Sequence, residues 1–251
     1  MDEAFAPYRQ RVIKALRSPD EGNGFAAEEK GGMVFVNFGQ QTRIKLPATL
    51  ICGGAARGGT TILSFLLTLF GQEMGDPEGS EDISFIDARF DPEALKDLIT
   101  LRNTQHQTWG IKIPGMSCGQ YQFFDETCRN PVYIYLYRNP LSVALSTLRH
   151  APERDLFPAN RRGLVTALNS AESSYVQFTQ FLAVTSSPVI LIAMEEMKRS
   201  PRRIIRRLIK ALRIEVSDER FEAICGLILE GGYKNISDLP PLPPNLPKTP
   251  E

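Results

Sequence analysis

Short apolar runs alternate with polar and glycine-rich segments along this chain. Continuous apolar runs next to turn residues predict buried strands, at 50–52, 131–137 and 188–194. Apolar stripes with helical spacing predict helices, at 60–69, 160–184 and 201–212. Strands that alternate with helices are typical of α/β proteins, and 251 residues can bury a sizeable core. We therefore expect one α/β domain over 1–251, with its core at about 48–235.

The N-terminal part predicts a small addition to this core. Residues 3–17 carry apolar side chains at helical spacing and predict a short amphipathic helix. Residues 18–32 are polar and contain glycine, so we expect a loop there. The segments 33–38 and 42–46 alternate and predict two strands joined by a turn at 39–41. We expect this β-hairpin at the edge of the main sheet.

Two helix starts are marked by a cap residue followed by proline. Asp91 precedes Pro92, and Ser200 precedes Pro201. Asp and Ser side chains accept hydrogen bonds from the first free N–H groups, and proline fits the first helical position. We therefore expect helices to begin at Pro92 and Pro201.

Composition sets limits on the partners and the compartment. Lys and Arg together number 29, as do Asp and Glu, so no overall charge attracts the chain to nucleic acid or membrane. The chain contains no apolar run long enough to span a bilayer and no signal-peptide pattern at its start, so we expect a soluble, cytoplasmic protein. The cysteines are scattered without a C-x-x-C pair, which predicts free buried thiols and no metal site: Cys52, Cys118, Cys128 and Cys225.

The stretch 50–71 has the order of a phosphate-binding unit. An apolar run leads into a loop with four glycines, and an apolar helical pattern follows. Glycines let the backbone approach an anion closely, and the helix N-terminus offers free N–H groups. Gly54 and Gly59 have the G-x-x-x-x-G spacing of a P-loop, and Thr61 fills its Ser/Thr position. Thr60 stands where such a loop has lysine, and Arg57 is the nearest cation.

This loop resembles the 5'-phosphosulfate loop of sulfotransferases, which usually reads Lys/Arg-Ser-Gly-Thr-Thr. Here the segment 57–61 reads Arg-Gly-Gly-Thr-Thr, so Gly58 replaces the usual serine and one hydroxyl contact is missing. The family uses 3'-phosphoadenosine 5'-phosphosulfate (PAPS). The resemblance implies that the 5'-phosphosulfate is held at Arg57, Gly58, Gly59, Thr60 and Thr61.

A second segment supports the first. The predicted strand 131–137 ends at Arg138-Asn-Pro, and Ser146 lies one to two turns into the next predicted helix. Ligands of open parallel sheets bind at the carboxyl ends of the strands, and an arginine fork with a hydroxyl suits a phosphate dianion. The segment resembles the 3'-phosphate motif of the same family, Arg-x-Pro-x-x-x-x-x-Ser, which assigns Arg138 and Ser146 to that phosphate.

A third match is the short predicted strand that carries Lys112. Trp109, Lys112 and Pro114 match a Trp-x-x-Lys-x-Pro pattern that follows the phosphate loop in the family. Lys112 lies between isoleucines, so its side chain points either to the solvent face of the sheet or into a cleft. The resemblance implies that it lies near the transferred group.

Together the matches imply a three-layer fold related to nucleotide kinases, with a central parallel sheet flanked by helices. They imply transfer of a sulfuryl group from PAPS to an acceptor hydroxyl or amine, without metal. Arg57 would offset charge on the bridging oxygen, and Lys112 would hold the sulfuryl oxygens or the leaving phosphate. The catalytic base is expected at Glu81, with Asp82 and Glu78 behind it. The histidine that many relatives use is missing, because proline stands at position 114.

Other interpretations stay open. One is a P-loop kinase or NTPase, which the threonine at position 60 and the lack of an acidic magnesium-binding strand end oppose. Another is a relative that binds nucleotide without turnover. The acceptor, whether carbohydrate, lipid headgroup or small natural product, depends on variable loops at 72–90, 114–130 and 149–160. The basic helix 201–213 is either a solvated surface or an anion-binding one, and the Pro-rich tail 236–251 predicts a polyproline-like segment.

Overall fold

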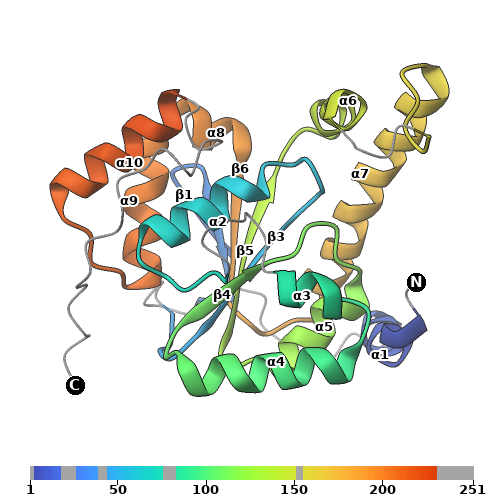
Figure 1. The fold of residues 1–251 in the computed structure, drawn as a ribbon, viewed down its shortest axis with the longest axis horizontal. Coiled ribbons are helices and arrows are strands. Elements are labelled where there is room, and N and C mark those ends of the chain that lie inside the picture. Colours follow the sequence, from blue (N-terminus) through green and yellow to red (C-terminus); the bar gives the residue numbers. More distant parts are fainter. Residues whose placement is uncertain (1–2, 18–26, 39–43, 76–82, 151–154, 231–251) are drawn as a thin grey trace.

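The computed structural model describes residues 3–17, 27–38, 44–75, 83–150 and 155–230 (Figure 1). Its centre is one six-stranded sheet with the order β1-β2-β6-β5-β3-β4. The strands are β1 (Ala27–Lys30), β2 (Met33–Val36), β3 (Thr49–Gly54), β4 (Trp109–Lys112), β5 (Pro131–Tyr137) and β6 (Val189–Ala193). Strands β6, β5, β3 and β4 are parallel, and β1 and β2 run antiparallel at one edge. The predicted α/β fold with a parallel central sheet is confirmed.

Helices connect the strands and cover both faces of the sheet (Figure 1). They are η1 (Glu3–Phe5), α1 (Ala6–Arg17), α2 (Thr60–Leu69), α3 (Ile83–Ala88), α4 (Pro92–Gln105), α5 (Cys118–Thr127), α6 (Pro140–His150), α7 (Arg161–Leu182), α8 (Met194–Arg199), α9 (Pro201–Leu212) and α10 (Asp218–Glu230). Because side chains alternate along a strand, β3 sends Leu50 and Cys52 to one face and Ile51 to the other. The first face packs on α2, α8, α9 and α10, and the second on α1, α4, α5 and α7.

The edge hairpin exists, but its strands differ from those predicted. Strand β2 pairs with β1, and the turn between them is Gly31-Gly32, with φ of 54° and 84°. Two glycines with positive φ form the tight turn that matches the twist of a hairpin. The prediction of a loop over 18–32 is therefore wrong for its last residues. The predicted strand 42–46 is not a strand at 44–46, and positions 39–43 lie outside the described residues.

Several predicted elements are confirmed closely. Helix α2 spans Thr60–Leu69 as expected, and α9 ends at Leu212. Helix α4 begins at Pro92, and the Asp91 carboxylate accepts hydrogen bonds from the N–H groups of Glu93 and Ala94 at 3.0 and 3.2 Å. Ser200 precedes α9, but its side chain forms no cap hydrogen bond.

Four helices were not predicted. Helices α3 and α5 lie within segments expected to be variable loops, α8 follows β6, and α10 follows α9. The start of α5 is a capping box, in which the Ser117 hydroxyl accepts from the N–H of Gln120 and the Gln120 side chain accepts from the N–H of Ser117.

The four cysteines are free and buried, as predicted. Among the described residues, no helix is both long and apolar enough to cross a bilayer.

Candidate functional site

The loop between β3 and α2 turns tightly around its own backbone. Gly54, Arg57 and Gly59 have φ of 153°, 64° and 101°, and the N–H of Gly58 donates to the carbonyl oxygen of Ala55 at 2.8 Å. Within the described chain, no hydrogen bond engages the N–H of Gly59, Thr60 or Thr61. These N–H groups open α2, where the helix dipole is positive. The loop therefore has the backbone donors that an anion needs.

Two of its glycines are required by close packing. A Cβ at Gly54 would lie 2.7 Å from Cγ2 of Thr60, and a Cβ at Gly58 would lie 2.7 Å from the carbonyl oxygen of Ala55. Both distances are shorter than real Cβ contacts. A serine at position 58, which the sulfotransferase pattern usually has, does not fit this loop without a shift. The departure from the pattern thus has a local structural cause.

Lys112 lies beside the loop at the end of β4. Its side chain is 5% exposed, and Nζ lies 3.5 Å from Oγ1 of Thr61, at the outer limit of a hydrogen bond. Burial raises the pKa of the Cys52 thiol to about 12, and the Lys112 ammonium opposes that rise. The orientation of Lys112 toward the solvent face is therefore excluded. Its ammonium is aimed at the first turn of α2.

The chain after β4 continues along the loop. The N–H of Ile113 donates to the carbonyl oxygen of Cys52 at 3.1 Å, and the N–H of Gly115 donates to that of Gly54 at 2.8 Å. Gly115 has a φ of 70°. These backbone bonds fix Lys112 relative to the loop after β3, because they join the residues that follow β4 to the last part of β3.

Arg138 reaches the same loop from β5. Its Nη1 donates to the carbonyl oxygen of Arg57 at 3.1 Å. The Tyr175 hydroxyl donates to the carbonyl oxygen of Arg138 at 2.5 Å, and it also accepts from the N–H of Arg138 at 3.4 Å. Burial raises the pKa of Tyr175 to about 12, so the hydroxyl keeps its proton. Tyr175 is part of the apolar stripe of α7, and the stripe alone gives no sign of this contact.

Asn139 turns the chain from β5 into α6. Its Oδ1 accepts from the N–H groups of Leu141 and Ser142 at 3.0 and 3.2 Å, and its own N–H donates to a Glu195 carboxylate oxygen at 3.3 Å. Ser146 lies in the second turn of α6 and is half-buried. No hydrogen bond among the described residues joins it to Arg138. The structure therefore brings Arg138 to the loop, but it shows no hydrogen bond between Arg138 and Ser146.

Packing holds α6, α7 and α8 near the loop. Ala55 is buried against Val143 of α6 and Ala171 of α7. A Cβ at Gly59 would lie 3.1 Å from Sδ of Met194. Met194 is buried and begins α8. The loop is thus enclosed by residues from three helices, and none of them is predicted to touch a ligand.

The structure describes the basic helix α9 but not the expected catalytic base. Glu81, with Glu78 and Asp82, lies outside the described residues, as does the tail 236–251. On α9, Arg202 pairs with Glu222 at 2.5 Å, and Arg203 pairs with Glu196 at 2.7 Å. Arg206 lies over the ring of Phe221 at 4.8 Å. These contacts favour a structural role for the basic side of α9.

No family model and no curated protein matches the sequence. Among solved structures, the sulfotransferase domain from the curacin biosynthetic pathway is similar, with 16% identity and a TM-score of 0.48 over 71% of this chain and 77% of that one. Mouse sulfotransferase SULT7A1 complexed with PAP has 15% identity and a TM-score of 0.48, over 80% of this chain and 74% of that one. A sulfotransferase from Alicyclobacillus acidocaldarius has 15% identity and a TM-score of 0.43, over 74% of this chain and 95% of that one. All three are sulfotransferases.

Proposed function

We propose that this protein transfers the sulfuryl group of PAPS to a hydroxyl or amine of a small-molecule or glycan acceptor. The hydrogen bond from Arg138 to the carbonyl oxygen of Arg57 carries the proposal, because it brings together the two segments that resemble the family's nucleotide motifs. The 3'-phosphate and 5'-phosphosulfate of one nucleotide belong to the same molecule, so their binding residues must be neighbours.

The residues present fit the anionic ends of this nucleotide. The free N–H groups of Gly59, Thr60 and Thr61 and the close approach that Gly58 permits would hold the 5'-phosphosulfate. Arg138 supplies a guanidinium fork for the 3'-phosphate, and Ser146 on α6 would supply a hydroxyl. The nucleotide supplies a sulfuryl group bound to a good phosphate leaving group.

In the proposed transfer, Lys112 and Arg57 would stabilise the negative charge that develops during the reaction. In the transfer, the acceptor oxygen or nitrogen bonds to sulfur while the bond from sulfur to the bridging oxygen breaks, and negative charge grows on the departing phosphate. The buried ammonium of Lys112 beside Thr61 would hold the sulfuryl oxygens, since a buried charge acts strongly in a low-dielectric site. Arg57 is exposed in the loop and would offset the charge on the bridging oxygen.

Glu81 is proposed as the base that takes the acceptor's proton. Replacing Glu81 with glutamine should keep nucleotide binding and abolish transfer of radiolabelled sulfate from PAPS to an acceptor. The matched variant Glu78→Gln should keep both. If Glu78→Gln loses transfer and Glu81→Gln keeps it, the base has been assigned to the wrong residue. If the wild type binds nucleotide but transfers to none of a wide acceptor panel, the chain is a binding protein.

The nucleotide itself can be tested without an acceptor. We expect 3',5'-adenosine bisphosphate (PAP) to raise the melting temperature without metal, more than ADP or ATP with magnesium does. A ligand at 100 times its Kd that binds only the folded state adds about 2.7 kcal/mol of stability. Arg138→Ala should lose this shift, and Arg162→Ala, at an exposed arginine of α7, should keep it. Stabilisation by ATP with magnesium but not by PAP would indicate a P-loop kinase or NTPase instead.

A further inference from the structure

Asn139 joins the two residues that we assign to the 3'-phosphate. Arg138 precedes it at the end of β5, and Ser146 lies on α6, which begins at the residue after Asn139. The side-chain oxygen of Asn139 accepts hydrogen bonds from two N–H groups in the first turn of α6, as a helix cap does. A shift of Asn139 would therefore move Arg138 and the start of α6 together.

Glu195, the second residue of α8, holds the backbone of Asn139. Its carboxylate accepts a hydrogen bond from the N–H of Asn139 at 3.3 Å, although the two residues are 56 positions apart in the sequence. The sheet register brings them together, because Tyr137 of β5 pairs with Ala193 of the parallel strand β6. Asn139 and Glu195 each lie two residues beyond that pair, at the same edge of the sheet. The contact is therefore set by the pairing of β5 with β6.

The charge of Glu195 alone does not explain its place. Within the described part of the chain, Glu195 forms no ion pair. Burial and, to a smaller extent, the nearby charge of Glu195 raise the pKa of Tyr175 to about 12, so the carboxylate lies near the hydroxyl that bonds the backbone of Arg138. A negative charge near a phosphate-binding arginine opposes the binding of an anion. The benefit of Glu195 at this place must therefore be geometric.

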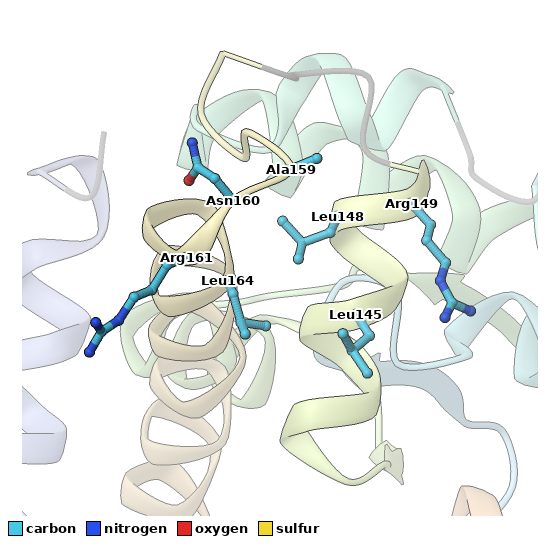
Figure 2. A pocket seen from close by; sticks show the side chains of 7 residues that line it. All are labelled: Leu145, Leu148, Arg149, Ala159, Asn160, Arg161 and Leu164. Atoms are coloured by element: carbon cyan, nitrogen blue, oxygen red, sulfur yellow. The ribbon is translucent and has the colours of Figure 1, made fainter.

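Packing on α7 holds the start of α6 more closely than its far half. Val143, in the first turn of α6, is buried against α7. Farther along, an open groove with a volume of about 380 Å³ lies between the two helices, and Figure 2 shows Leu148 of α6 and Leu164 of α7 pointing toward this gap. The direction of α6, and with it the place of Ser146, therefore depends on the contacts at the start of the helix.

We propose that Glu195 is a positioning residue for the 3'-phosphate site. By holding the N–H of Asn139, it fixes the place of Arg138 and of the first turns of α6. The inference rests on the proposed function, in which Arg138 and Ser146 bind the 3'-phosphate of PAPS. Glu195 does not touch the nucleotide in this role. It contributes selectivity, because residues held in place before binding favour a nucleotide with a 3'-phosphate over one that lacks it.

The test compares PAP with 5'-AMP, which has the same adenosine and 5'-phosphate but no 3'-phosphate. Calorimetry on the full chain gives the Kd of each, and the ratio of the Kd of 5'-AMP to that of PAP measures selectivity for the 3'-phosphate. Glu195→Gln and Glu195→Leu remove the same charge, but only glutamine keeps an oxygen that can accept from the N–H of Asn139. We expect this ratio to be about fivefold lower in the leucine variant than in the glutamine variant, as for one lost hydrogen bond, with an equal Kd for 5'-AMP in both.

Glu196→Leu is the matched control, because Glu196 lies in the same turn of α8 and pairs with Arg203 instead of Asn139. Its ratio should stay within about twofold of the wild-type value at 0.15 M salt, where exposed charges are screened. Equal ratios in the two Glu195 variants would show an effect of charge alone, and equal weakening of both nucleotides by leucine would show a general loss of structure; either result overturns the inference. Glu195→Ala takes the place of the leucine variant if that variant does not fold. A wild type that binds PAP no more tightly than 5'-AMP would overturn the 3'-phosphate site itself, and the inference with it.

Discussion

The guanidinium of Arg138 donates a hydrogen bond to the backbone carbonyl oxygen of Arg57 across 3.1 Å. The two residues are far apart in the sequence, yet this bond joins the end of β5 to the loop before α2. Tyr175 of α7 holds the backbone of Arg138 from the other side. The fold itself therefore positions the cation at the loop, which would lower the entropy cost of the phosphate binding proposed above.

Arg138→Lys should separate charge from geometry. Lysine keeps the positive charge but lacks the planar fork that binds a phosphate through two parallel hydrogen bonds. We expect PAP to bind about tenfold more weakly than to the wild type, consistent with the loss of one charge-assisted bond. Calorimetry with PAP measures this. An unchanged Kd in the lysine variant would show that Arg138 contributes charge alone.

Tyr175→Phe should loosen Arg138 without touching a ligand. The variant removes the hydroxyl that bonds both the carbonyl oxygen and the N–H of Arg138, and we expect a loss of about 1 kcal/mol of unfolding free energy together with weaker PAP binding. Tyr137→Phe is the matched control, because its ring lies 4.9 Å from that of Tyr175 and it is 45% exposed. Urea unfolding and PAP titration of both variants give the comparison. Equal effects in the two would remove Tyr175 from its positioning role.

Lys112→Met should show whether Lys112 acts in nucleotide binding or in sulfuryl transfer. Methionine fills a similar volume but removes the contact of the ammonium with Thr61, so we expect the variant to fold with a somewhat lower melting temperature. Sulfuryl transfer from PAPS should fall by about a hundredfold, the usual cost of one lost electrostatic contact to a transition state. PAP binding should change little. A loss of PAP binding as large as the loss of transfer would place Lys112 on the nucleotide instead of the sulfuryl group.

The sequence predicts elements best where a local signal marks their ends. Helix α4 begins at an Asp-Pro cap, and α2 begins where the glycines stop, so the starts of both could be derived. The capping box at Ser117 and Gln120 is also legible, yet α5 has no simple apolar stripe because most of its first residues are buried on all sides. Its helical pattern is hidden by burial.

Long-range pairing explains the other differences. Both Gly31-Gly32 and the segment 39–41 are plausible hairpin turns, and only the pairing of β2 with β1 and β6 decides between them. The direction of Lys112 depends on α2 covering that face of the sheet, which periodicity cannot give. The contact between Tyr175 and Arg138 joins residues 37 positions apart. The loop residues 57–61 are contiguous and can be recognised in the sequence, whereas the residues that position the loop come from distant segments.

Asp125 gives the protein a pH-dependent contribution to stability. Burial raises the pKa of this carboxyl above its ordinary value of 3.8, although nearby polar groups of Ser187, Thr185 and Tyr133 oppose the rise. One carboxylate oxygen accepts from the Thr185 hydroxyl at 3.1 Å, and the other has no partner among the described residues. The folded state thus favours the neutral acid more strongly than the unfolded state does. Its contribution is fully present below pH 3.8 and is lost as the pH rises through the folded-state pKa.

Asp125→Asn should reveal this contribution, because asparagine does not titrate. We expect the unfolding free energy of the wild type, measured against that of the variant, to increase as the pH is lowered from about 7 to about 4. Urea unfolding at several pH values gives the difference, and carboxyls common to both proteins cancel in it. A difference that stays constant, or that falls as the pH is lowered, would contradict the raised pKa.

Gly58→Ser should weaken the loop, although it restores the residue that the sulfotransferase pattern usually has. The added Cβ would lie 2.7 Å from the carbonyl oxygen of Ala55, the same oxygen that accepts the N–H of Gly58. Since that oxygen belongs to the backbone, relief requires the loop to open, and we expect a loss of about 1–3 kcal/mol of unfolding free energy. Gly58→Ala carries the same Cβ without the hydroxyl. If alanine destabilises and serine does not, the hydroxyl has found a partner in a rearranged loop; equal destabilisation, together with a smaller PAP shift in both, would tie nucleotide binding to the tight turn between Ala55 and Gly58.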